Sequence, residues 1–326
     1  MLLLTKAIFA IMIGFLSSAV LGLILIPILK KLKLGQRVSV FVGEAHRKKE
    51  GTPTIGGLIF IIPTVIATIV LTLTDKIPYT ANLGIVLLVF LGYACIGFLD
   101  DFLSIRRGKN EGLTTYQKLI MQVLIAIGFF YIYMRNGGQT SWVVGTLHID
   151  LEMGWLYGLF ILFVLVGASN AVNLTDGLDG LAGGLSAIAF IAFSLISLVV
   201  GFEDIGIFSL ILVGSLLGYL IYNTHPAKVI MGDTGSLALG ATMGAIAILT
   251  HRELTLLVVA GIFVIETLSV ILQTFWVQVF HKKLFLMTPI HHHFEKLGWE
   301  ETDIVKLFWV GGLLLAMAGI IFGVWL

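Results

Sequence analysis

Long apolar runs, separated by short polar segments, make up most of this chain. Ten such runs can be drawn, each close to the length of about 20 residues that an α-helix needs to cross a bilayer. Helices are expected because a spanning segment must satisfy its backbone hydrogen bonds internally. We therefore expect an all-α, polytopic membrane protein with about ten spanning helices. The runs extend from Ala7 to Leu29, Ile55 to Leu73, Leu83 to Leu99, Leu119 to Tyr133, Trp155 to Val172, Leu185 to Val200, Ile205 to Tyr222, Leu237 to Leu249, Leu254 to Val279 and Ile304 to Trp325.

The polar segments between the runs are too short to form a soluble domain of their own. The longest include Lys30 to Thr54 and His281 to Asp303, so residues 1–326 are expected to form a single membrane domain. Within another segment, apolar and polar residues alternate from Thr140 to Glu152 around Gly145. This alternation predicts a short β-hairpin on the membrane surface.

Charged residues are scarce and unevenly distributed. The chain is 58% hydrophobic and 12% charged, which excludes an ordinary soluble domain. Sixteen of the 20 Lys and Arg residues fall in one set of alternating loops, which the positive-inside rule assigns to the cytoplasm. Both termini and the hairpin are then expected outside. The inside set is Lys30, Lys31, Lys33, Arg37, Arg47, Lys48, Lys49, Arg106, Arg107, Lys109, Lys118, Lys228, Lys282, Lys283, Lys296 and Lys306, and the outside set is Lys6, Lys76, Arg135 and Arg252.

The chemically reactive side chains gather in the loops assigned to the cytoplasm, which predicts one composite site on that face. Asp100 and Asp101 directly follow the third apolar run. A carboxylate pair at a membrane surface must be solvated, paired with cations or bound to a metal ion. The alternative is a helix-terminal pair that balances Arg106 and Arg107.

A second group of polar side chains follows the fifth run. Asn170, Asn173, Asp176 and Asp179 occur at three-residue steps, which places them on roughly one face if the helix continues. Two carboxylates and two carboxamides directed at one spot suit a hard cation, a ribose or a base edge. The alternative is a helix cap followed by ordinary turn residues.

A third polar segment extends from Asn223 to Ser236. Gly232 and Gly235 flank Asp233, and glycine allows the backbone to approach a ligand closely. A carboxylate in this setting suits Mg²⁺, which is usually held by one or two carboxylates and substrate phosphates. The alternative is a simple N-cap of the next helix, formed by Asp233 or Ser236.

Two further features involve histidine and a membrane carboxylate. His291, His292 and His293 are consecutive, and neighbours on a helix diverge by about 100°, so the three cannot share one metal ion. One or two of them are expected to contact a phosphate. Glu266 interrupts the ninth run, and an ionisable residue inside the membrane is a functional candidate. The alternative is a protonated Glu266 that is hydrogen bonded across a helix interface.

These motifs resemble those of bacterial phospho-N-acetylmuramoyl-pentapeptide transferases, over essentially the whole chain. The aspartate motifs are shared with the wider superfamily of polyprenyl-phosphate N-acetylhexosamine-1-phosphate transferases. The Thr-Pro-Thr and His-His-His-Phe-Glu runs indicate the muramoyl branch. The matching segments are Lys48-Lys49, Thr52-Pro53-Thr54-Ile55-Gly56-Gly57, Asp100-Asp101-Phe102, Asn170 to Gly180, Met231 to Ser236 and Pro289 to Glu295.

The resemblance implies a Mg²⁺-dependent phosphoglycosyl transferase in the inner membrane of a bacterium. Members of the family transfer phospho-MurNAc-pentapeptide from UDP-MurNAc-pentapeptide to undecaprenyl phosphate, which gives lipid I and UMP. The reaction belongs to peptidoglycan synthesis, and thereby to cell-wall biogenesis, cell shape and cell division. The implied partners are these two substrates and the lipid bilayer, without nucleic acid, and a homodimer is compatible with the resemblance.

The resemblance also implies roles for individual residues. Asp233 and Asp176 are the expected Mg²⁺ ligands, and Asp100 and Asp101 are expected near the attacking lipid phosphate. The expected catalytic residues are Asp100, Asp101, Asp233, His291 and His292. The expected substrate-binding residues are Lys49, Thr52, Lys118, Asn170, Asn173, Asp176, Asp179, Asn223, Ser236 and His293.

One position departs from the family pattern, and alternatives stay open. The family often has Phe where this chain has Ile230, so stacking on uracil is not expected there. A sibling enzyme that uses UDP-GlcNAc is one alternative, and a solute transporter is another. Transporters, however, place ionisable residues near the bilayer midplane. For the reaction itself, direct attack by the lipid phosphate is favoured over an aspartyl-phosphate intermediate, because a phosphate monoester is largely anionic at neutral pH.

Overall fold

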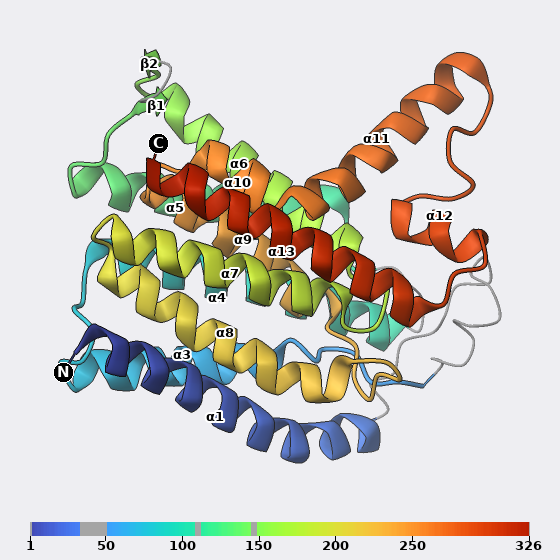
Figure 1. The fold of residues 1–326 in the computed structure, drawn as a ribbon, viewed down its shortest axis with the longest axis horizontal. Coiled ribbons are helices and arrows are strands. Elements are labelled where there is room, and N and C mark those ends of the chain that lie inside the picture. Colours follow the sequence, from blue (N-terminus) through green and yellow to red (C-terminus); the bar gives the residue numbers. More distant parts are fainter. Residues whose placement is uncertain (1, 33–50, 108–111, 145–148, 326) are drawn as a thin grey trace.

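The chain folds into a bundle of long helices with one small β-hairpin (Figure 1). The structure is a computed structural model and describes residues 2–32, 51–107, 112–144 and 149–325. The helices are α1 (Leu3–Lys31), α3 (Leu58–Leu73), α4 (Ala81–Arg107), α5 (Thr115–Arg135), α6 (Leu156–Thr175), α7 (Leu181–Val199), α8 (Glu203–Asn223), α9 (Gly232–Leu249), α10 (Glu253–Val259), α11 (Gly261–Phe280), α12 (Ile290–Lys296) and α13 (Glu301–Trp325), and the strands are β1 (Ser141–Val144) and β2 (Ile149–Glu152).

Each predicted apolar run corresponds to helix in the structure, which confirms a multi-pass, mainly helical membrane protein. In the described residues, nine helices are long and apolar enough to cross a membrane. The second run forms α3, which has 16 residues and is shorter than those nine.

The ninth run was predicted as one continuous helix, and that prediction is wrong. It is divided into α10 and α11 at Ala260, whose φ and ψ are −91° and 20°. Gly261 follows the break directly, and a Cβ there would lie 2.9 Å from Leu315 Cδ1 of α13. Because of this break, α11 leaves the bundle at an angle (Figure 1).

The interior of the bundle is built around α7, α8 and α9, whose side chains are mostly buried. The helices α1, α5, α11 and α13 expose most of their apolar surface, as expected for helices that face lipid. Close packing against α8 depends on small residues. A Cβ at Gly14 of α1 would lie 2.2 Å from the Ile211 carbonyl oxygen, and one at Gly214 would lie 2.1 Å from that of Ile11. The two backbones therefore approach as closely as small residues allow.

The two ends of the bundle differ in character. β1 and β2 pair antiparallel, with Ser141 opposite Glu152, which confirms the predicted hairpin. The start of α1 and the end of α13 lie at the same end of the bundle as the hairpin, and α12 lies at the opposite end (Figure 1). The polar motifs discussed below gather at that opposite end, near the start of α9.

Candidate active site

The centre of the site is a cluster of charged and amide side chains from four helices. Lys118 at the start of α5 places its Nζ 2.9 Å from Asp100 Oδ1 of α4 and 2.9 Å from Asp233 Oδ2 of α9. Asn173 of α6 donates from Nδ2 to Asp233 Oδ1 at 2.8 Å and to Ser236 Oγ at 2.9 Å. Five residues that the sequence had assigned to one site therefore lie together.

Asp101 has a different environment from Asp100. Its carboxylate accepts from the backbone N–H groups of Asp233 and Thr234 at 3.1 and 3.0 Å, and from the Thr234 hydroxyl at 2.6 Å. These N–H groups belong to the first turn of α9, where helical donors have no partner within the helix. Asp101 thus caps α9 from a neighbouring helix, whereas Asp100 shares Lys118 with Asp233.

Close backbone packing sets the position of Asp233. A Cβ on Gly97 of α4 would lie 2.1 Å from the Asp233 carbonyl oxygen, so α4 and the start of α9 can meet only at a glycine. Gly232 has a φ of +74°, which favours glycine. A Cβ there would lie 2.5 Å from Asp101 Oδ2. The glycines around Asp233 therefore allow its backbone N–H to reach Asp101 while its carboxylate contacts Lys118.

The Thr-Pro-Thr-Ile-Gly-Gly run packs against the segment that precedes α9. The Ile230 N–H donates to the Pro53 carbonyl at 2.8 Å, and the Ile230 carbonyl accepts from Gly56 N–H at 2.9 Å. The Gly57 N–H donates to the Met231 carbonyl at 3.0 Å. This run therefore supports the Asp233 loop through backbone hydrogen bonds.

The four polar residues at three-residue steps do not share one face, because α6 ends at Thr175. Asn173 joins the Lys118 cluster, whereas Asn170 is exposed and donates back to the Val166 carbonyl at 2.8 Å. Asp176 is the C-cap residue of α6, and its N–H donates to the Asn173 carbonyl at 3.2 Å. The condition that the helix continues is therefore not met, and Asp179 lies in a second cluster.

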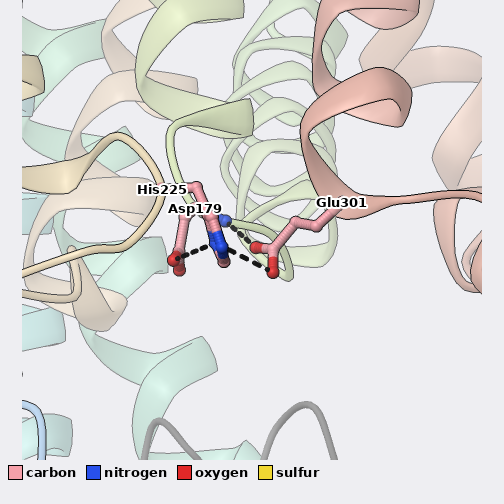
Figure 2. A group of neighbouring side chains, drawn as sticks. All are labelled: Asp179, His225 and Glu301. Atoms are coloured by element: carbon pink, nitrogen blue, oxygen red, sulfur yellow. Dashed lines mark hydrogen bonds and ion pairs between the residues drawn. The ribbon is translucent and has the colours of Figure 1, made fainter.

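Asp179, His225 and Glu301 form that second cluster (Figure 2). The His225 Nδ1 lies 3.1 Å from Asp179 Oδ2 and 3.4 Å from Glu301 Oε2, so the ring stands between the two carboxylates. The Asp179 N–H donates to Glu301 Oε1 at 2.6 Å, and Asp179 Oδ2 also accepts from Ala227 N–H at 3.0 Å. Three distant segments are joined here, and Glu301 is not among the site residues predicted from the sequence.

Asn223 connects the same segments through its amide. Its Oδ1 accepts from Gly180 N–H at 3.1 Å, and its Nδ2 donates to the Val229 carbonyl at 3.0 Å. The side chain is 4% exposed. In this structure Asn223 holds the loops that carry Asp179 and Asp233, and its direct contact with substrate stays a prediction.

The three histidines contact three different groups, as expected for consecutive residues on a helix. His291 is buried, and its Nδ1 lies 3.1 Å from Glu266 Oε1. His292 Nδ1 bonds Glu295 Oε2, and His293 Nδ1 accepts from Leu286 N–H at 3.1 Å. Glu266, which showed no partner in the sequence, is therefore hydrogen bonded across a helix interface, to His291.

Comparison with known proteins gives the family of the chain. Residues 83–251 match the model of the family described as Glycosyl transferase family 4. The chain is 46% identical to the phospho-N-acetylmuramoyl-pentapeptide-transferase of Bacillus licheniformis, over 98% of both chains. It is 47% and 48% identical to the proteins of the same name from Bacillus subtilis and Bacillus velezensis, again over 98% of each chain. The chain belongs to the phospho-N-acetylmuramoyl-pentapeptide-transferase family.

Some of the predicted substrate-binding residues of this transferase lie outside the two clusters. Lys49 falls outside the described residues. Thr52 is half-buried and directly precedes the segment that pairs with Ile230. The substrate-binding roles of Lys49, Thr52 and Asn170 stay predictions for this transferase.

Proposed function

We propose that this transferase moves phospho-MurNAc-pentapeptide from UDP-MurNAc-pentapeptide to undecaprenyl phosphate, with lipid I and UMP as products. The observation that carries the proposal is the convergence of Asp100, Asp233 and Asn173 around Lys118 at one end of a membrane bundle. A soluble nucleotide sugar and a membrane-bound phosphate can meet only at such an interface. The names of the relatives support the same reaction.

The orientation of the protein in the membrane is part of the same proposal. The excess of Lys and Arg in the loops at the site end favours the cytoplasm for that end, and the termini and hairpin then lie outside. The enzyme would act in the inner membrane of a bacterium, where its nucleotide substrate is made available from the cytoplasm. Peptidoglycan synthesis, and with it cell shape and division, would depend on this step.

The site suits Mg²⁺, because two carboxylates already converge on one positive charge. Lys118 Nζ lies 2.9 Å from oxygens of both Asp100 and Asp233, and carboxylate oxygens are the ligands that Mg²⁺ prefers. Asp233, with Asp176 as the second predicted ligand, would hold the ion, and Asp100 adds a third carboxylate nearby. When bound, Mg²⁺ would neutralise the charge of the pyrophosphate and of the leaving UMP.

The residues of the Lys118 cluster have different proposed roles. Lys118 supplies a fixed positive charge for the pyrophosphate oxygens, which is the main electrostatic need of phosphoryl transfer. Asn173 orients Asp233 through its amide. Asp101 is committed to the cap of α9, so Asp100 is the carboxylate proposed to position the lipid phosphate for direct in-line attack.

The deciding experiment is Mg²⁺-dependent UMP release by the purified protein from UDP-MurNAc-pentapeptide and undecaprenyl phosphate. We expect release by the wild-type protein and its loss in Asp233→Asn. Release from UDP-GlcNAc instead would identify the sibling activity. Substrate uptake into proteoliposomes without UMP formation would favour a transporter. UMP release without the lipid phosphate, or a trapped sugar phosphate linked to Asp, would overturn direct attack.

A further inference from the structure

Glu266 and His291 form a completely buried pair between α11 and α12. Both side chains are 0% exposed, and His291 Nδ1 lies 3.1 Å from Glu266 Oε1. The residues are 25 positions apart and meet because the chain turns back after α11. A carboxylate that binds one ring nitrogen of a histidine determines which nitrogen carries the proton and how the ring is oriented.

The other ring nitrogen of His291 is buried without a hydrogen-bond partner among the described residues. Buried polar atoms are nearly always hydrogen bonded, and an exception calls for an explanation. The direction of His291 Nε2 supplies an explanation. A Cβ on Gly177 would lie 2.3 Å from His291 Nε2, so the nitrogen is aimed at the loop between Asp176 and Asp179. That loop carries two of the predicted nucleotide contacts.

We propose that Glu266 is a positioning residue, which holds His291 so that Nε2 contacts a phosphate oxygen of the nucleotide sugar. This role rests on the function proposed above. The Glu266 carboxylate accepts a hydrogen bond from the Nδ1–H group and leaves Nε2 directed at Gly177. When the anionic phosphate binds, Nε2 takes up one proton from water, the ring becomes positively charged between Glu266 and the phosphate, and the new N–H donates to the phosphate oxygen.

The neighbouring histidines are bonded to groups other than Glu266. His292 Nδ1 is bonded to Glu295, and His293 Nδ1 accepts from the Leu286 backbone. Of the three, His291 is the one that is 0% exposed and directed at Gly177. The role therefore falls on His291.

A purely structural role for Glu266 can be tested separately from a role in positioning His291, because Gln273 also holds the segment that follows α11. Gln273 Oε1 accepts from the N–H groups of Leu284 and Phe285, each at 2.9 Å. Among the described residues, no hydrogen bond joins Gln273 to His291, so Gln273→Ala is a matched control. It loosens the same segment and leaves the Glu266 carboxylate in place.

The first test measures the ring nitrogens directly by NMR, with ¹⁵N-labelled histidine in protein reconstituted into lipid nanodiscs. The His291 signals are assigned from their loss in His291→Gln. We expect a proton on Nδ1 in the wild-type protein and in Gln273→Ala. In Glu266→Ala we expect that proton to move to Nε2, the tautomer that isolated imidazole side chains prefer. A wild-type His291 without a proton on Nδ1, or an unchanged ring in Glu266→Ala, overturns the proposal.

The second test is kinetic and uses Glu266→Gln, which has nearly the same shape. We expect kcat to fall about 10- to 100-fold, the usual effect of altering a group that supports a functional histidine, because a neutral amide removes the negative charge that stabilises the protonated ring. The KM for the nucleotide sugar should change little, because the Asp179 cluster is intact. Glu266→Asp keeps a carboxylate and should recover part of kcat, and Gln273→Ala should keep wild-type kcat.

Different results would overturn the proposed function and the proposed role of Glu266. A wild-type protein that releases no UMP overturns the proposed function, whatever the ring nitrogens show. A wild-type protein that releases UMP, combined with a Glu266→Gln variant of equal kcat, overturns only the role of Glu266.

Discussion

Asp101 holds the first turn of α9 through Thr234, whose backbone N–H and hydroxyl both donate to Asp101 Oδ2, at 3.0 and 2.6 Å. We predict that Asp101→Asn lowers the stability of the protein by about 1 to 3 kcal/mol, the range for losing a cap or a hydrogen bond to a charged group. Thermal unfolding followed by tryptophan fluorescence measures this. Asp100→Asn is the matched control and should shift Tm less, because Asp100 accepts from one backbone N–H, that of Leu113 at 2.7 Å, whereas Asp101 accepts from two and from a hydroxyl. Equal shifts would contradict the distinction between the two aspartates.

Gly232 beside Asp101 gives a second prediction. Its φ of +74° disfavours a side chain, and a Cβ would also lie 2.8 Å from the Thr54 hydroxyl oxygen. Gly232→Ala should therefore displace Asp233 and abolish UMP release. Gly201→Ala is a control for backbone strain alone, since Gly201 has a φ of +94° and nothing within 4 Å of its Cβ position. It should lower stability by about 1 to 2 kcal/mol and keep activity. An active Gly232→Ala would contradict the close fit.

Most of the fold could be predicted from the sequence, because membrane thickness imposes a run of apolar residues on every spanning helix. The gathering of the motifs at one end of the bundle could be predicted from the alternation of spans and loops, whereas the assignment of that end to the cytoplasm stays a prediction. The break at Ala260 could not, since a single residue hardly changes the apolar pattern. The contacts of Glu301 and Glu266 could not be predicted either, because each partner lies far away in the sequence or on another helix.

The roles of adjacent residues depend on geometry in the same way. Asp100 and Asp101 are neighbours of identical chemistry, yet successive helix positions diverge by about 100°. One carboxylate meets Lys118 and the other meets Thr234. Likewise, the end of α6 at Thr175 separates Asn173 from Asp179, although both follow the same three-residue spacing.

Lys118 offers a third prediction, because it keeps two like charges together. Lys118→Gln should lower kcat about 100- to 1,000-fold, the usual loss when one fixed group that stabilises transition-state charge is removed. The two carboxylates would then lack their cation, so the Mg²⁺ concentration for half-maximal activity should fall. A Mg²⁺ titration of the residual activity measures this, with Lys118→Arg as the charge-preserving control. A higher Mg²⁺ requirement in Lys118→Gln would contradict the prediction.

Glu301 offers a fourth prediction, on nucleotide binding. It accepts the Asp179 N–H at 2.6 Å and lies 3.4 Å from His225 (Figure 2). Glu301→Ala should release the Asp179 loop and raise the KM for the nucleotide sugar about tenfold, which corresponds to about 1.4 kcal/mol. Glu300→Ala removes an exposed carboxylate from the preceding position and should leave KM unchanged. Equal KM values for the two variants would show that the cluster has no part in binding.

Ile230 offers the last prediction, because the structure separates its backbone role from its side chain. The backbone N–H and carbonyl pair with Pro53 and Gly56, and these bonds do not depend on the side chain. Ile230→Phe introduces the residue that the family resemblance predicts at this position, where an aromatic ring is expected to stack on uracil. Stacking on a base contributes about 1 to 3 kcal/mol, so the KM for the nucleotide sugar should fall about fivefold or more. Ile230→Leu keeps an aliphatic side chain and should leave KM unchanged. Competition by UMP against UDP-MurNAc-pentapeptide in both variants would measure the same difference independently of turnover. A KM that is equal in Ile230→Phe and Ile230→Leu would mean that uracil binds away from this position.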